Sequence, residues 1–170
     1  MLRIVLIAVA FLGLATPSLA AKQMSLFDGF LKKSNSHSSF SSMSAPRSVS
    51  GPVSITVDIS TQTMDVVADG QTVYSFDVST GRKGYSTPTG NYRPIRMHTM
   101  WYSSKYENSP MPYSIFFKGG YAIHGTGDIK HLGQIASHGC VRLHPDNAKL
   151  LFELVEKVGM ANTKISLIRS

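Results

Sequence analysis

The sequence predicts a mainly β domain in which two packed β-sheets of mixed strand direction are accompanied by one amphipathic helix. Several short segments alternate apolar and polar residues, which is the period of a strand with one buried face. Only one segment has the three- and four-residue apolar spacing of a helix. Strands and helices do not alternate, which argues against a parallel α/β sheet. The regular pattern covers residues 52–170 of the 170-residue chain, enough for one domain with one core.

The strands are predicted in order from residue 53. Apolar residues occupy every second position over residues 53–60. Residues 63–68 and 71–80 flank Asp69-Gly70, the strongest short-range signal for a hairpin. Glycine and proline over residues 81–94 indicate a loop. Further short strands are predicted at residues 92–102, 114–117 and 121–123, around Val141, and at 164–168.

One helix is predicted after residue 144. Pro145 suits a first helical turn, and Asp146 places negative charge near the positive end of the helix dipole. Gly159 ends the pattern. The apolar stripe consists of Leu150, Leu151, Leu154, Val155 and Val158.

The first 20 residues have the three parts of a secretory signal peptide. Arg3 precedes an apolar run over residues 4–14, and Pro17 is followed by a small-residue end at Ala20. We therefore predict export with cleavage after Ala20. A retained membrane anchor is the alternative, although the run is shorter than the roughly 20 apolar residues that span a bilayer.

Residues 21–51 are dominated by serine and predict a flexible linker, because such a segment buries too little apolar surface to offset its ordering entropy. The alternative is a wall-binding arm that uses its lysines and arginine. The formal net charge of the chain is +7, which favours anionic partners. Export argues against nucleic acid and leaves a polyanionic wall or membrane surface.

The only cysteine, Cys140, lies in the segment Ser-His-Gly-Cys-Val-Arg at residues 137–142. In an exported protein this thiol could be inert and buried, form an intermolecular disulfide, or act as a nucleophile. Gly139 favours the nucleophile, because a glycine lets backbone N–H groups approach a reacting carbonyl. A nucleophilic thiol also needs a base. His124 offers one, at the end of an apolar strand and directly before Gly125.

A zinc site is the competing interpretation of this region, and its candidate ligands are His124, His131, His138, Cys140 and His144. The spacing of two between His138 and Cys140 does not complete a tetrahedral set, and no second cysteine or carboxylate falls at a familiar spacing. We therefore predict neither a metal nor another cofactor.

The segment from Ile123 to Leu143, IHGTGDIKHLGQIASHGCVRL, closely resembles the active-site signature of the L,D-transpeptidases, the YkuD-type catalytic domain. That signature is a His-Gly, a spacer, and then Ser/Thr-His-Gly-Cys. STGRKGYSTPTGNYRP and the Met-Pro-Tyr at residues 111–113 resemble further family segments. Arg142 stands where some members carry asparagine. Arginine is common there in Gram-negative-type members, so it does not count against the resemblance. Export and a cell-wall substrate together predict a location in the periplasm or at the cell wall.

The resemblance implies a fold of two packed sheets with a helix alongside, and it implies a chemistry. Cys140 would attack the carbonyl of the third residue of a peptidoglycan stem tetrapeptide, usually meso-diaminopimelate, and release the terminal D-alanine. An amine of a second stem would then take the acyl group from the thioester and form a 3-3 cross-link. Peptidoglycan stem peptides are therefore the expected partners, and no obligate protein partner is indicated.

The catalytic roles follow from the same resemblance. Cys140 would be the nucleophile and His124 the general base, with the carbonyl of Gly125 orienting the imidazole ring. Backbone N–H groups of His138, Gly139 and Cys140 are candidates for an oxyanion hole. The ring of His138 would either support the loop or take part in catalysis.

Three further residues are predicted to contribute to substrate binding. Ser137 is expected to form hydrogen bonds within the loop. Arg142 would hold a stem carboxylate, with a salt bridge to a core acid as the alternative. Tyr113 would line the donor pocket or pack in the core.

The same thioester permits other outcomes. With water as the acceptor, the protein would be an L,D-carboxypeptidase or an endopeptidase. With a lipoprotein lysine as the acceptor, it would attach that lipoprotein to peptidoglycan. A wall-binding module without activity is the remaining alternative.

Overall fold

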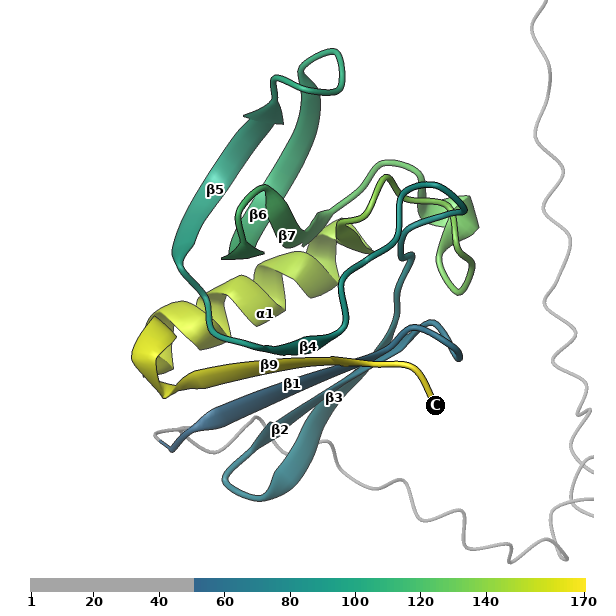
Figure 1. Ribbon diagram of the computed structural model, residues 1–170. Coiled ribbons are helices and arrows are strands. Elements are labelled where there is room, and N and C mark those ends of the chain that lie inside the picture. The colour runs from purple at the N-terminus through teal and green to yellow at the C-terminus, as the bar shows by residue number, and fades with distance from the viewer. Residues whose placement is uncertain (1–50) are drawn as a thin grey trace, which may run out of the picture. The chain divides into compact units, whose positions relative to one another are not determined.

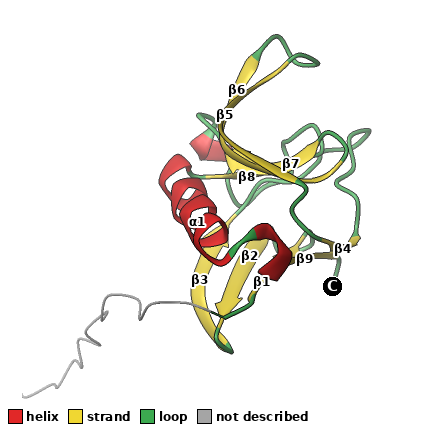
Figure 2. Ribbon diagram, turned by 90° about the vertical axis from the view of Figure 1, so that its left-hand side faces the viewer, coloured by secondary structure: helices red, strands yellow, loops and turns green. Residues whose placement is uncertain are grey.

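The computed structural model describes residues 51–170. The predicted signal peptide and the predicted linker up to residue 50 lie outside the described residues. Within them the chain forms a five-stranded sheet, a four-stranded sheet and one α-helix (Figures 1 and 2). Both sheets contain parallel and antiparallel pairs, so the predicted mainly β fold with mixed strands is confirmed.

The five-stranded sheet has the strand order β3-β2-β1-β9-β4. Asp69 and Gly70 connect its first hairpin with φ angles of 50° and 75°, the two positive values that a type I′ turn requires. β1 pairs antiparallel with β2 and parallel with β9, the last strand of the chain. The strands are β1 (Val53–Asp58), β2 (Thr63–Ala68), β3 (Gln71–Asp77), β4 (Gly90–Tyr92) and β9 (Thr163–Ile168).

The four-stranded sheet has the order β5-β6-β7-β8. Its strands are β5 (Arg96–Ser103), β6 (Ser109–Lys118), β7 (Tyr121–Gly125) and β8 (Val141–Leu143). The β5–β6 hairpin projects beyond the rest of the sheet (Figure 1). Its outer residues are mostly exposed. The strand predicted at residues 92–102 covers most of β5, whereas β6 begins five residues before the predicted segment 114–117.

Helix α1 (Pro145–Val158) begins and ends as predicted. His144 caps its first turn, because its Nδ1 accepts a hydrogen bond from the backbone N–H of Asp146 at 3.3 Å. Gly159, with φ of 87°, ends it. Two short 3₁₀ helices, η1 (Ile129–His131) and η2 (Met160–Asn162), were not predicted.

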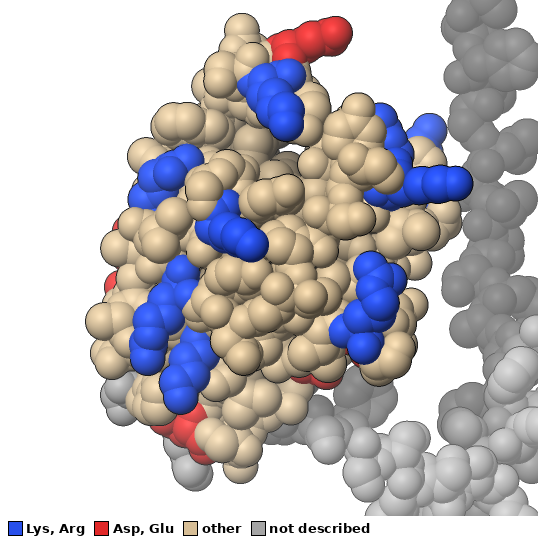
Figure 3. Space-filling view, in the orientation of Figure 1, with Lys and Arg blue, Asp and Glu red and all other residues tan. Residues whose placement is uncertain are grey.

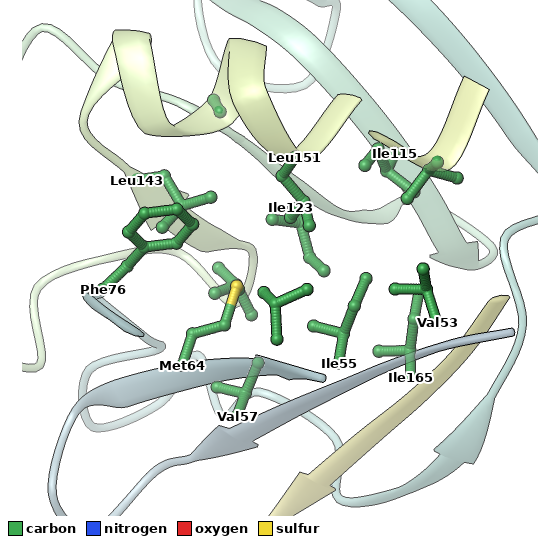
Figure 4. Close-up of a cluster of buried hydrophobic side chains, with 14 of the residues drawn as sticks. Val53, Ile55, Val57, Met64, Phe76, Ile115, Ile123, Leu143, Leu151 and Ile165 are labelled. Atoms are coloured by element: carbon green, nitrogen blue, oxygen red, sulfur yellow. The ribbon is translucent and has the colours of Figure 1, made fainter. Parts of the chain in front are cut away.

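The main hydrophobic core lies between the two sheets and α1 (Figure 4). Full burial of each such side chain contributes about 1.5–3 kcal/mol. The labelled side chains of Figure 4 include Val53, Ile55 and Ile165 from the first sheet, Ile115, Ile123 and Leu143 from the second, and Leu151 from α1.

The second sheet has two different faces. Ile115, Ile123 and Val141 point into the main core. Their neighbours Phe116 and Ala122 form a separate small cluster, against which Cys140 packs. Because side chains alternate along a strand, the face turned away from the core carries the cysteine.

Basic side chains are spread over the face of the molecule in Figure 3, and acidic ones lie mainly at its margins. No helix within residues 51–170 is both long and apolar enough to cross a bilayer.

Candidate active site

Cys140 and His124 are brought together by two adjacent parallel strands. β7 pairs with β8 in a register that places Ile123 beside Val141 and His124 beside Arg142. Cys140 directly precedes β8 and therefore lies beside Ala122, two residues along from His124 and on the same face of the sheet. Both side chains line one open cleft of about 560 Å³. The structure thus places both residues of the predicted pair on the same cleft.

The β5–β6 hairpin forms the far side of this cleft. Residues from the hairpin, from the loop after β7 and from the cysteine segment all contribute to the wall. The lining residues on the hairpin include Arg96, Trp101, Tyr106, Met111 and Phe116, and those nearer the cysteine include Gly120, Asp128, His138 and Arg142.

His124 is held as a neutral imidazole with one free ring nitrogen. Its side chain is only 7% exposed, and burial lowers the pKa of His124 from 6.5 to about 4. The positive charge of Arg142 lowers this pKa further, and the hydrogen bond to the carbonyl of Gly125 opposes the shift. Because that carbonyl can only accept, Nδ1 donates to it at 2.8 Å, as predicted for Gly125. Nε2 is left unprotonated and can accept a proton.

Cys140 is a half-buried thiol. Burial raises the pKa of Cys140, while a hydrogen bond from the backbone of Ala122 and the charge of Arg142 act in the opposite direction. Its Sγ donates a weak hydrogen bond to the carbonyl of Gly120 at 3.8 Å. Without a substrate, the pair therefore consists of a neutral thiol and a neutral imidazole.

The loop before the thiol is fixed by internal hydrogen bonds. Ser137 Oγ donates to the carbonyl of Cys140 at 2.6 Å and accepts from the N–H of Gly139 at 3.0 Å. Thr87 Oγ1 donates to the carbonyl of Gly139 at 2.8 Å. Gly139 has φ of 111°, and a Cβ there would lie 2.7 Å from the ring of Tyr121. Glycine is therefore required at this position.

These contacts confirm that Ser137 forms hydrogen bonds within the loop, and they correct two other predictions. Ser137 is fully buried, so it supports the loop and cannot contact a substrate. The N–H of Gly139 is already bonded to Ser137, so it is not free to act as an oxyanion donor. The N–H groups of His138 and Cys140 remain the candidates for that role.

The ring of His138 connects the cysteine loop to two neighbouring segments. Arg82 Nη2 donates to His138 Nε2 at 2.6 Å, and Tyr85 packs edge-on against the ring. Tyr106, from the turn of the β5–β6 hairpin, lies over it with ring centroids 4.6 Å apart. Burial and then the charge of Arg82 lower the pKa of His138. These contacts place His138 as a support between the loop and the hairpin.

Arg142 lines the cleft beside His124. Its Nη1 lies 3.5 Å from Asp128 Oδ2, and the Asp128 carboxylate also accepts from His131 Nδ1 at 2.7 Å. The hydrogen bond from His131 is the main cause that lowers the pKa of Asp128. Arg142 is thus oriented by an acid of the cleft wall, which differs from the core acid considered as an alternative.

Tyr113 does not line the cleft, so of its two predicted placements the one in the core is found. Its ring packs edge-on against Phe152 of α1 at 5.9 Å, on the core side of β6. Tyr113 is two residues from Ile115, so ordinary strand alternation places its side chain on the core face of β6.

Several cleft residues were missed by sequence reasoning. Asp128 lies in a loop, and Arg96, Trp101 and Tyr106 lie on the hairpin. Asp128 had a weak signal, because it follows His124 by four residues within the spacer of the signature. The hairpin residues come from a separate part of the chain and are brought to the cleft only by strand pairing. Within residues 51–170, no three side chains of His, Cys, Asp or Glu are grouped so that they could hold a metal ion.

The fold and the cleft define a class of two-sheet proteins in which a cysteine and a histidine meet at the ends of two parallel strands. Residues 52–165 match the YkuD family, described as the L,D-transpeptidase catalytic domain. The chain belongs to this family, which confirms the resemblance seen in the sequence.

Individual relatives agree with this assignment. The chain is 26% identical over 97 residues to YkuD of Bacillus subtilis, and the match covers 55% of this chain and 54% of that protein. It is similar to the crystal structure of an L,D-transpeptidase (Yku) from Stackebrandtia nassauensis, with 29% identity, a TM-score of 0.61, and coverage of 78% of this chain and 61% of the other. An L,D-transpeptidase from Xylanimonas cellulosilytica is 30% identical, with a TM-score of 0.60 and coverage of 72% and 63%. The chain thus spans less than two thirds of each of these relatives.

Proposed function

We propose that this protein is an exported peptidoglycan L,D-transpeptidase that transfers an acyl group through Cys140. Family membership supports the general activity. One observation carries the assignment of the residues: Cys140 and His124 line the same cleft, and the hydrogen bond to Gly125 leaves the second ring nitrogen of His124 free to accept a proton. The signal-like N-terminus supports a location in the periplasm or at the cell wall.

In the first half-reaction, Sγ of Cys140 attacks the carbonyl carbon of the third stem residue. Because thiol and imidazole are neutral beforehand, the thiol proton passes to Nε2 of His124 as the S–C bond forms. The N–H groups of His138 and Cys140 stabilise the developing oxyanion, and such donors can each contribute roughly 3 kcal/mol. His124 then protonates the nitrogen of the leaving D-alanine, and the C–N bond breaks to leave a thioester.

In the second half-reaction, a side-chain amine of another stem attacks the thioester. Neutral His124 removes a proton from this amine, and the thiol is released with that proton. The product is a 3-3 cross-link between two third-position residues. Arg142, oriented by Asp128, is suited to hold a stem carboxylate close to the reacting carbonyl, because a guanidinium forms two parallel hydrogen bonds with such a group.

The test is to incubate the purified chain with tetrapeptide muropeptides. We expect release of D-alanine and, by mass spectrometry, dimers joined through two third-position residues. The Cys140→Ser variant should keep its circular dichroism spectrum and lose both products. Full turnover by this variant would contradict the mechanism.

The same assay separates the alternatives. D-alanine release without dimers would indicate an L,D-carboxypeptidase, and cleavage of existing dimers an endopeptidase. Transfer of the stem to a lipoprotein lysine would indicate an attachment enzyme. Binding of the chain to sacculi with no change in muropeptide mass would indicate a non-enzymatic wall-binding module.

A further inference from the structure

A second cationic group, Arg96, lies in the cleft away from the Cys140–His124 pair. Arg96 begins β5 and is paired in register with Phe116 of β6, which is paired in turn with Ala122 of β7. Ala122 lies one position before the Ile123–Val141 pair, so Cys140 continues the same row. One row across the four strands therefore contains Arg96, Phe116, Ala122 and Cys140. Three strand spacings place the outer two Cα atoms about 14 Å apart.

The guanidinium of Arg96 is held in place by aromatic rings. It lies 3.8 Å from the ring centroid of Phe116 and 5.5 Å from that of Trp101. Trp101 also packs against Phe116 with centroids 5.6 Å apart. A guanidinium that is in contact with ring faces keeps its N–H edge available for hydrogen bonds.

A local break in the strand alternation of the β5–β6 hairpin brings Trp101 to the same face of the sheet as Arg96. Arg96 and Trp101 are an odd number of positions apart and would face opposite ways on a regular strand. The ring of Trp101 nevertheless lies 4.8 Å from that of His98, which is on the face of Arg96. The positive φ of Tyr113 on the partner strand marks where the alternation changes. A strained non-glycine residue at such a position is typical of functional sites.

Arg96 also lacks an acidic partner. Among residues 51–170, no carboxylate lies within ion-pair distance of its guanidinium, whereas Arg142 is paired with Asp128. Arg96 is half-buried and lines the cleft. A fixed, unpaired guanidinium in the cleft wall is suited to bind a carboxylate bidentately.

We propose that Arg96, held against Phe116 and Trp101, binds a carboxylate of the peptide stem at the β5 end of the cleft. This inference rests on the proposed function, because a diaminopimelate stem supplies the free side-chain carboxylate. The site would make the protein prefer stems with a free carboxylate over stems in which this group is a carboxamide. The carboxylate can belong to the donor stem or to the acceptor stem, which share this chemistry.

The activity test compares the free acid and the carboxamide in two arms. In the donor arm, hydroxylamine replaces the acceptor and D-alanine release is measured from each donor. In the acceptor arm, one donor is fixed and dimer formation is measured with each acceptor. We expect the wild-type kcat/KM to favour the free acid by about tenfold in at least one arm, and that arm identifies the stem concerned.

Arg96→Gln should reduce this preference to less than about threefold, and Arg96→Lys should give an intermediate preference, because lysine keeps the charge and loses the planar fork. Lys118→Gln is the matched control: Lys118 is an exposed cation on β6 outside the cleft lining, and its loss should leave the preference unchanged. If Arg96→Gln slows the acid and the carboxamide equally, or if the wild type does not discriminate between them, the inference is wrong.

A binding measurement keeps this result separate from the proposed function. Trp101 is the only tryptophan of the chain, so its fluorescence reports on this site alone. In the Cys140→Ala background, the acid peptide should bind about tenfold more tightly than the carboxamide, and Arg96→Gln should remove the difference. Discrimination in binding without D-alanine release by the wild type would contradict the proposed activity and support the carboxylate site. Turnover by the wild type, without a difference in binding between the acid peptide and the carboxamide, would support the proposed activity and contradict the carboxylate site.

Discussion

The low pKa of His124 predicts a specific loss of stability in acid. In the unfolded chain a histidine has a pKa of 6.5, and in the folded protein burial brings the pKa of His124 to about 4. The unfolded chain therefore takes up this proton first as the pH falls. The stability that depends on neutral His124 is fully present above pH 6.5 and decreases as the pH drops toward 4.

The magnitude follows from the two pKa values. Each pH unit of difference corresponds to 1.36 kcal/mol, and half of the folded molecules are protonated at pH 4, so the loss between pH 7.5 and pH 4 is about 3 kcal/mol. The substitution that removes this titration is His124→Asn, because the asparagine amide still offers a donor to the carbonyl of Gly125.

The assay is urea unfolding of the wild type and of His124→Asn between pH 7.5 and pH 4. We expect the free-energy difference between the two proteins to change by about 3 kcal/mol over this range, with the wild type losing more on acidification. Cys140→Ser is the control, because it keeps His124. Its free energy of unfolding should change with pH in parallel with that of the wild type. Parallel profiles for the wild type and His124→Asn would refute the assignment of a buried neutral base.

Three further predictions concern the same cleft. Alkylation of Cys140 by iodoacetamide, measured by intact mass, should be slow at pH 5–7 and accelerate through the ordinary thiol range near pH 8.5 and above; a fast acidic plateau would indicate a preformed thiolate. Asp128→Asn should raise KM several-fold with little change in kcat, because Arg142 loses its orienting partner, whereas Asp146→Asn at the exposed start of α1 should have no effect. In thermal unfolding, Gly139→Ala should be less stable than Gly133→Ala by about 1–3 kcal/mol. Both glycines have a positive φ, but only at Gly139 does a side chain lie within 3 Å of the added Cβ. Equal losses of stability in the two variants would contradict the packing argument.

Local patterns predicted most of the fold. The Asp69-Gly70 turn and the bounds of α1 depend on residues that are neighbours in sequence, and both were found where they were expected. The loop over residues 81–94 contains β4 (Gly90–Tyr92), which is too short and too exposed to have a period of its own. It is a strand only because β9 provides its partner.

The site residues that were predicted are those that lie within one short segment of the sequence. His124, Gly125 and Cys140 lie within a recognisable signature. The structure brings His124 and Cys140 to one cleft, and the carbonyl of Gly125 holds the ring of His124. Arg96 and Trp101 belong to the opposite wall, and their relation to Cys140 depends on the register of three strand pairs and on a local break at Tyr113. No property of a single segment contains that information.

Burial acts in opposite directions on the two central groups. It favours the neutral form of each, so the pKa of His124 falls and the pKa of Cys140 rises. The positive charge of Arg142 lowers the pKa of both groups, so it changes the difference between the two pKa values little. Transfer of the proton from thiol to imidazole is therefore unfavourable until an attacked carbonyl provides an oxyanion for the loop N–H groups to stabilise.

This arrangement also accounts for an unpaired cysteine in a protein with the N-terminus of an exported chain. The thiolate is the form that oxidants and disulfides attack, and susceptibility follows thiolate character. Burial raises the pKa of Cys140 and so favours the thiol form, from which we expect slow reaction with oxidants and with disulfides. In the proposed mechanism the substrate carbonyl draws the proton away, so the burial that favours the thiol form would also restrict its reactivity to an acyl group bound in the cleft.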